Sequence, residues 1–227
     1  MPRRERPPTT SRSEHWLRVA VQDTPAFLNQ KIRTAFVWQK EEVINWLSPV
    51  ASDGYAEYYD EAFLQLLGLD NLRAPLREFW PRSGPRWDGL AVTDSGKQIL
   101  VEAKAYPEEA VDGGSKSKDP RSSAMIEAAF HQSKAAFGVP QHANWSTPFY
   151  QYANRLAHLY YLAGLNELDA YLVFVYFADA PDVPQPCSAA EWTGAKRVIE
   201  KALGLPVRHK FSARVATIVI PADRLGR

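Results

Sequence analysis

Residues 86–106, RWDGLAVTDSGKQILVEAKAY, constrain the fold of this chain more than any other segment. Two apolar runs flank the turn-forming residues DSG, which is the pattern of a β-hairpin. The three-residue loop predicts a type I turn followed by a left-handed residue, a position that Gly96 fills without steric cost. This loop pairs Thr93 with Lys97 and thereby sets the register of the whole hairpin.

The predicted hairpin carries charged side chains where a buried strand is normally apolar. One face of the second strand is wholly apolar and consists of Ile99, Val101, Ala103 and Ala105. The other face is apolar near the turn and becomes ionic away from it, at Glu102 and Lys104. The three-residue loop places Asp88 directly opposite Glu102, with the Cβ atoms about 4.5–5.5 Å apart. A four-residue loop would oppose Asp88 to Ala103 instead.

Two carboxylates so close repel each other, and three arrangements relieve the repulsion: a shared proton, a basic neighbour such as Lys104, or a bound cation. Mg²⁺ accepts carboxylates, backbone carbonyls and water, and the carbonyl of Ala103 lies between Glu102 and Lys104. Such a metal lowers the pKa of a bound water, and the Lys104 ammonium would stabilise charge in the transition state. The alternative is a neutralised ion-pair network that stabilises the sheet.

The rest of the chain predicts a mixed α/β domain with one sheet. The expected elements are helices in 13–54, a helix at 55–69, a short strand at 76–81, the hairpin, a loop at 107–123, helices at 124–137 and 148–165, a strand at Ala170–Ala178, a capping-box helix from Ser188 to about Leu203, and a last strand within 214–222. A basic, disordered tail is expected at 1–12.

Asp88, followed after thirteen residues by Glu102-Ala103-Lys104, resembles the D…(D/E)xK signature of the PD-(D/E)xK nuclease superfamily. The order of elements over residues 55–180 is similar to the restriction-endonuclease-like core of that superfamily: a helix, three strands, helices and a strand. Trp87 precedes Asp88, so the literal PD of the motif is absent. The resemblance implies one nuclease-like domain over 13–227, with extra N-terminal helices in 13–54 and a C-terminal helix and strand in 181–227.

The resemblance also implies Mg²⁺-dependent hydrolysis of nucleic-acid phosphodiester bonds, with Mn²⁺ as a substitute metal. Asp88 and Glu102, with the Ala103 carbonyl, would be the metal ligands, and Lys104 the catalytic lysine. DNA is the favoured substrate, in a restriction, repair or defence role. The alternative function is a catalytically inactive, nuclease-like protein that binds nucleic acid or another partner.

Supporting residues are expected on two helices. The superfamily often places a further acid on the first core helix, where Glu57 is the candidate, although its position off the apolar face of that helix favours a solvated face. Gln151, Asn154, Arg155 and His158 form one polar stripe on an otherwise apolar helix. The stripe faces either a strip of solvent or an internal cleft, and in the cleft Gln151 and Arg155 would support the acids.

Basic residues in the 107–123 loop and the global composition bear on partners. Lys116, Lys118 and Arg121 are expected to contact a phosphate backbone, or else are solvated charge. A formal net charge of +1 gives no global attraction to nucleic acid or membrane. The single cysteine fits a reducing cytoplasm, no signal peptide is evident, and the segment Ala170–Ala178 is too short to cross a bilayer. Nucleases that cut both strands are often dimers, so a homodimer is left open.

Overall fold

A five-stranded mixed sheet forms the centre of the computed structural model, which describes residues 3–4, 12–115 and 117–226. The strands are β2 (Ile44–Ser48), β4 (Gly89–Thr93), β5 (Gln98–Lys104), β6 (Ala170–Ala178) and β7 (Val215–Pro221), in the order β2-β4-β5-β6-β7. The pairs β2–β4 and β4–β5 are antiparallel, whereas β5–β6 and β6–β7 are parallel. The predicted α/β class with a mixed sheet and an antiparallel hairpin is therefore confirmed.

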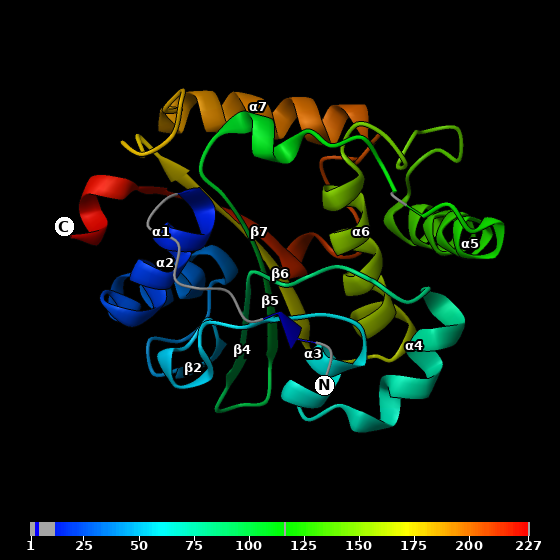
Figure 1. Cartoon of the computed structure of the whole chain (residues 1–227), viewed down its shortest axis with the longest axis horizontal. Helices are drawn as coiled ribbons and strands as arrows, with labels where there is room; N and C mark the ends of the chain where they lie inside the picture. The colour runs from blue at the N-terminus through cyan, green and yellow to red at the C-terminus, as the bar shows by residue number, and fades with distance from the viewer. Residues whose placement is uncertain (1–2, 5–11, 116, 227) are drawn as a thin grey trace.

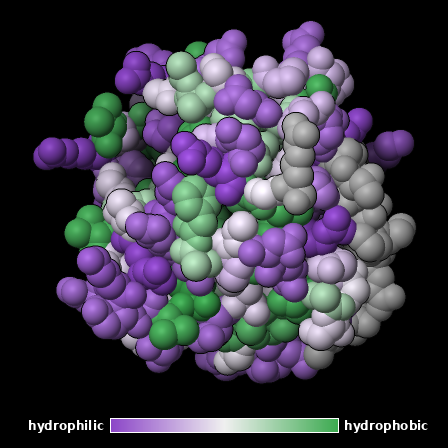
Figure 2. Space-filling view, turned by 90° about the vertical axis from the view of Figure 1, so that its left-hand side faces the viewer, coloured by the Kyte–Doolittle hydropathy of each residue, from purple (hydrophilic) through white to green (hydrophobic). Residues whose placement is uncertain are grey.

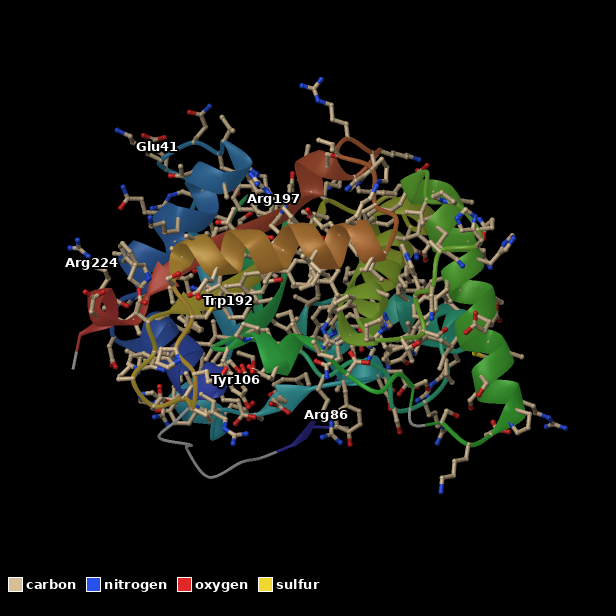
Figure 3. All side chains as sticks on the ribbon, turned by 90° about the horizontal axis from the view of Figure 1, so that it is seen from above. Glu41, Arg86, Tyr106, Trp192, Arg197 and Arg224 are labelled. Atoms are coloured by element: carbon tan, nitrogen blue, oxygen red, sulfur yellow. The ribbon has the colours of Figure 1, made fainter. Side chains whose placement is uncertain are left out.

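Helices cover both faces of this sheet, as Figure 1 shows. The helices are α1 (Arg12–Gln22), α2 (Pro25–Phe36), α3 (Glu61–Leu66), α4 (Arg73–Phe79), α5 (Pro120–Phe137), α6 (Tyr150–Leu159) and α7 (Ala189–Ala202). Successive side chains of β6 point to opposite faces of the sheet. Val173 and Val175 pack with α1 and α2 on one face, whereas on the other face Phe174 stacks on Tyr152 of α6 with ring centroids 3.9 Å apart. Trp192 of α7, labelled next to its helix in Figure 3, lies on the same side of the sheet as α6.

The register of the hairpin follows the three-residue loop predicted from the sequence. Thr93 N–H donates to the carbonyl of Lys97 at 2.9 Å, and Leu90 lies opposite Leu100. Gly96 has φ +89°, the left-handed conformation that the loop requires. Continuing this register by two residues brings Asp88 opposite Glu102.

Two predicted elements of the N-terminal half are wrong. Residues 76–81 are not a strand: α4 spans most of them, because Leu72, Leu76 and Phe79 recur at helical spacing and are all buried. The third strand of the antiparallel part is instead β2, which lies within residues 13–54, expected to be helical. A segment as short as INWLS, in which Ile44, Trp46 and Leu47 are apolar, can be a strand or part of a helix by periodicity, and pairing with β4 decides for the strand.

The helix expected at 55–69 is interrupted. Glu57–Tyr58 form a short strand, β3, and Asp60 has φ +52°, so the helix begins only at Glu61. The expectation of a disordered tail at 1–12 falls mostly outside the described residues. Of residues 1–12 the structure describes Arg3, Arg4 and Arg12. Arg3–Arg4 form β1, which pairs antiparallel with β3, and α1 begins at Arg12.

The second half of the chain follows the sequence prediction more closely. Strands β6 and β7 lie where expected, and the capping box of Ser188 and Glu191 begins α7. Helix α5 begins earlier than expected, because Asp119 accepts hydrogen bonds from the backbone N–H groups of Arg121 and Ser122. Helix α6 begins at Tyr150, two residues after the expected start, and continues through a π-helical turn over Tyr160–Leu165.

Within the part of the chain that the structure describes, no helix is both long and apolar enough to cross a bilayer. On the left-hand face of the molecule, hydrophobic residues lie in small separate groups among hydrophilic ones (Figure 2). This is the pattern of an outer layer whose apolar side faces the core.

Candidate active site

A cleft of about 930 Å³ opens beside the C-terminal end of β5. It contains the predicted catalytic and supporting side chains, namely Glu57, Asp88, Glu102, Lys104, Gln151 and Arg155. They come from β3, the start of the hairpin, β5 and α6, so four separate segments of the chain converge here. The convergence follows from the fold, because α6 packs on the face of the sheet to which Glu102 and Lys104 point.

Asp88 lies just before β4, at the point where the ladder with β5 ends. Its Oδ2 accepts a hydrogen bond from the backbone N–H of Ala103 at 2.7 Å. In a strand, the N–H and C=O of one residue point to the same side. The carbonyl of Ala103 therefore also points toward Asp88, as the proposed metal site requires.

Glu102 is 2% exposed and lies between two cationic side chains. Its Oε1 accepts from Nζ of Lys104 at 2.5 Å, and its Oε2 accepts from Nε of Arg155 at 2.6 Å. Lys104 in turn donates to Oε1 of Gln151 at 3.0 Å. The repulsion between the two acids is thus offset partly by basic neighbours, the second of the three arrangements considered from the sequence.

Arg155 connects the acids to the wall of the cleft. It is 5% exposed, and besides Glu102 it donates to the carbonyl of Arg86 at 2.6 Å and to Oδ1 of Asn154 at 2.7 Å. Its guanidinium carbon lies 4.9 Å from the centre of the Trp87 ring, and Trp87 is fully buried. These contacts fix the guanidinium group on three sides, so Arg155 holds Glu102 in one position.

The charged side chains of the site shift one another's pKa values. Burial, together with the negative charge of Glu102, raises the pKa of Asp88 from 3.8 to about 7. Burial alone would also raise the pKa of Glu102, but Arg155 and Lys104 outweigh it and lower that pKa. Burial alone would lower the pKa of Lys104, but Glu102 and Asp88 raise it. At neutral pH the site therefore holds an ionised Glu102, a charged Lys104 and an Asp88 close to its titration midpoint.

Two further predicted residues lie in unexpected environments. Glu57 lines the cleft and is buried, but it belongs to β3 and not to a helix, so neither the helical position nor a solvated face is correct. His158 is 1% exposed and lies outside the cleft among aromatic rings, with Nδ1 2.9 Å from the carbonyl oxygen of Asn154. Burial lowers the pKa of His158 to about 3, so the ring is neutral. The polar stripe of α6 thus faces the interior, and only its first part reaches the acids.

Two of the three residues predicted to contact phosphate can be located in the structure, Lys118 and Arg121. Lys118 and Arg121 are exposed on the loop before α5 and at its first turn, and neither lines the cleft, although the neighbouring Ser117 does. Lys116 lies outside the described residues. Contact of this loop with a phosphate backbone stays a prediction.

Sequence reasoning missed several residues of the cleft. Glu109 is half-buried, accepts from the backbone N–H of Ala105 at 2.7 Å, and has a pKa that burial raises. Asp112 accepts from the backbone N–H of Gln151 at 2.7 Å and so caps α6 from a distant loop. The position of Glu109 just beyond the end of the second hairpin strand was a usable signal, whereas no local pattern indicates the role of Asp112.

The donor atoms fit a hard divalent cation. Within the described residues, no group of three or more His, Cys, Asp or Glu side chains is placed to hold a metal. Mg²⁺ is usually bound by one or two carboxylates and completes its shell with water and substrate phosphate. Asp88, Glu102 and the carbonyl of Ala103 supply such oxygens on one side of the cleft, and they would hold the ion.

No protein-family model matches the chain, and neither the curated proteins nor the solved structures contain a match. The function is therefore inferred from the geometry of the cleft.

Proposed function

We propose that the protein is a divalent-metal-dependent nuclease with a restriction-endonuclease-like core, which hydrolyses nucleic-acid phosphodiester bonds, with DNA as the favoured substrate. The observation that supports the proposal most is the position of Asp88, Glu102 and Lys104 side by side at the floor of one cleft. Two facing carboxylates with an adjacent ammonium are costly to bury without a compensating function. The arrangement also agrees with the motif resemblance of the sequence.

Each side chain has a role in this reaction. Asp88, Glu102 and the Ala103 carbonyl would hold Mg²⁺ or Mn²⁺, which would supply a water of lowered pKa and polarise a phosphoryl oxygen. The Lys104 ammonium would stabilise the negative charge that develops on the scissile phosphate. Arg155 keeps Glu102 ionised and in place, and Gln151 orients Lys104.

One observation favours a second candidate, a nuclease-like protein without catalysis. Both oxygens of Glu102 already accept charged hydrogen bonds, one from Lys104 and one from Arg155. A carboxylate neutralised in this way can serve the stability of the sheet alone. This candidate predicts that nucleic acid is bound but not cut.

A cleavage assay separates the two candidates. The protein is incubated with labelled single- and double-stranded DNA and RNA, with Mg²⁺, Mn²⁺ or a chelator. We expect metal-dependent cleavage that falls roughly 100-fold or more in Asp88→Ala and Lys104→Ala. Lys97→Ala is the matched control, because Lys97 pairs with Glu42 at the other end of the hairpin. Equal activity in the protein and in Asp88→Ala would overturn the proposal.

A further inference from the structure

The wall of the cleft carries two side chains that the chemistry above does not use, Tyr59 and Arg86. Both line the cleft, Tyr59 half-buried and Arg86 exposed. The guanidinium carbon of Arg86 lies 5.4 Å from the centre of the Tyr59 ring. In Figure 3, Arg86 lies toward the lower edge of the view. A planar cation over an aromatic ring is a surface on which a further planar group can stack.

The backbone fixes both side chains relative to the acids. Tyr58 and Trp87 form an antiparallel bridge, with the N–H of Trp87 donating to the carbonyl of Tyr58 at 3.1 Å. The next residues outward on the two segments are Tyr59 and Arg86. The carbonyl of Arg86 also accepts from Arg155, which holds Glu102. The stacking surface is therefore tied to the catalytic acid through one arginine.

Asp88, Glu102 and Lys104 all line the cleft, and Asp88 is half-buried. Glu102 is 2% exposed, and the side chain of Lys104 is 12% exposed. A phosphate must enter the cleft to reach them. Clefts of about 300–1,000 Å³ bury drug-sized ligands, so the volume of about 930 Å³ accommodates a short piece of one strand.

We infer that the substrate enters this cleft as an unpaired strand, with one base stacked on the Tyr59–Arg86 surface and the neighbouring phosphate at Asp88, Glu102 and Lys104. Bases in a duplex are stacked on their neighbours and paired at their edges, whereas unpaired bases stack freely on aromatic and guanidinium planes. The inference rests on the proposed function, since it names the substrate class of the same site. The recognition chemistry is shared by single-stranded DNA and RNA.

Binding without cleavage tests this inference. In an Asp88→Asn background, which removes cleavage, fluorescence anisotropy is measured with labelled oligo(dT), oligo(U) and a mixed-sequence DNA duplex of the same length. We expect both single strands to bind more tightly than the duplex, with the tighter of the two identifying the natural strand. Tyr59→Leu should weaken single-strand binding about tenfold through loss of the ring, whereas Tyr59→Phe should retain it. Arg86→Ala should also weaken binding, and Arg73→Ala, an exposed arginine of α4 outside the cleft, should not.

Equal affinity for the duplex and for the single strands would overturn the inference. So would equal single-strand binding by Tyr59→Leu, Tyr59→Phe and the Asp88→Asn parent. Thermal unfolding of each variant checks that Tyr59→Leu is folded, and Arg86→Ala provides a second test at an exposed position. Wild-type cleavage separates the inference from the nuclease proposal. Duplex cleaved as fast as single strands would overturn the inference and support the nuclease. No cleavage of any strand, together with binding that depends on Tyr59, would overturn the nuclease and support the unpaired strand as ligand.

Discussion

Nε of Arg155 donates to Oε2 of Glu102 at 2.6 Å, and both side chains are buried. This contact joins α6 to β5 and links the second layer of helices to the acidic end of the hairpin. It also determines the charge state of the site, because Arg155 helps to lower the pKa of Glu102 while the charge of Glu102 raises that of Asp88. One ion pair thus affects the stability of the fold as well as the chemistry of the cleft.

Arg155→Ala is expected to lower the free energy of unfolding by about 3 kcal/mol, because it leaves Glu102 buried with only one of its two cationic partners. The measurement is urea-induced unfolding at neutral pH. Lys196→Ala is the matched control: Lys196 pairs with Glu200 on the surface of α7, with both side chains about a third exposed. Loss of the Lys196–Glu200 pair should lower the free energy of unfolding by at most about 0.5 kcal/mol. Similar losses in the two variants would contradict a buried pair at Arg155.

The raised pKa of Asp88 predicts how stability depends on pH. The folded protein keeps the Asp88 proton up to about pH 7, whereas the unfolded chain releases it near the ordinary value of 3.8. The contribution of Asp88 is therefore fully present below pH 3.8 and is lost as pH rises through about 7, by at most about 1.4 kcal/mol per pH unit.

Asp88→Asn replaces the protonated carboxyl with a neutral group of the same shape. The variant should not show the decrease in stability with rising pH that Asp88 causes. It should also be more stable than the parent protein at about pH 8. Urea-induced unfolding at a series of pH values measures both curves. Parallel curves for the two proteins between about pH 4 and 7 would show that Asp88 does not titrate as inferred.

The hairpin could be predicted from the sequence because its determinants are local. The DSG turn and the alternation of side chains define the register, and the register brings Asp88 to Glu102. The contacts that complete the site are not local. Arg86 and Arg155 meet across 69 positions of the chain, and Asp112 caps α6 from 39 positions away. Such pairs depend on how α6 packs on the sheet, and no single-segment pattern records that packing.

The errors of the sequence prediction have the same origin. The segment INWLS of β2 is an edge strand only because β4 offers it a partner, and residues 76–79 are helical because Leu76 and Phe79 both face the core. Glu57 reaches the cleft because the chain is extended there and takes a left-handed turn at Asp60. In each case a tertiary contact decided between two local conformations of similar propensity.

Metal binding should depend on pH in the opposite direction to proton binding, because the ligands must lose their protons first. We expect Mg²⁺ and Mn²⁺ to raise the melting temperature more at about pH 8 than at about pH 6, since Asp88 titrates near 7. Thermal unfolding with metal or chelator measures the effect. Asp88→Asn should show little metal-induced shift at either pH. A full shift in that variant would mean that the metal binds elsewhere.

Gly89 directly follows Asp88 and lies where α1 packs closely on the sheet. A Cβ at this position would lie 3.2 Å from Cβ of Val101, 3.3 Å from the ring of Trp46 and 3.4 Å from the side chain of Leu17. Gly89→Ala is therefore expected to destabilise the protein by about 1–3 kcal/mol through overpacking. The matched control is Gly194→Ala, because Gly194 lies inside α7 and an added Cβ meets no atom within 4 Å. That variant should gain about 0.5–1 kcal/mol from the better helix propensity of alanine. Chemical unfolding of the two variants checks the contrast, and a neutral Gly89→Ala would mean that α1 can move away from the strand that positions Asp88.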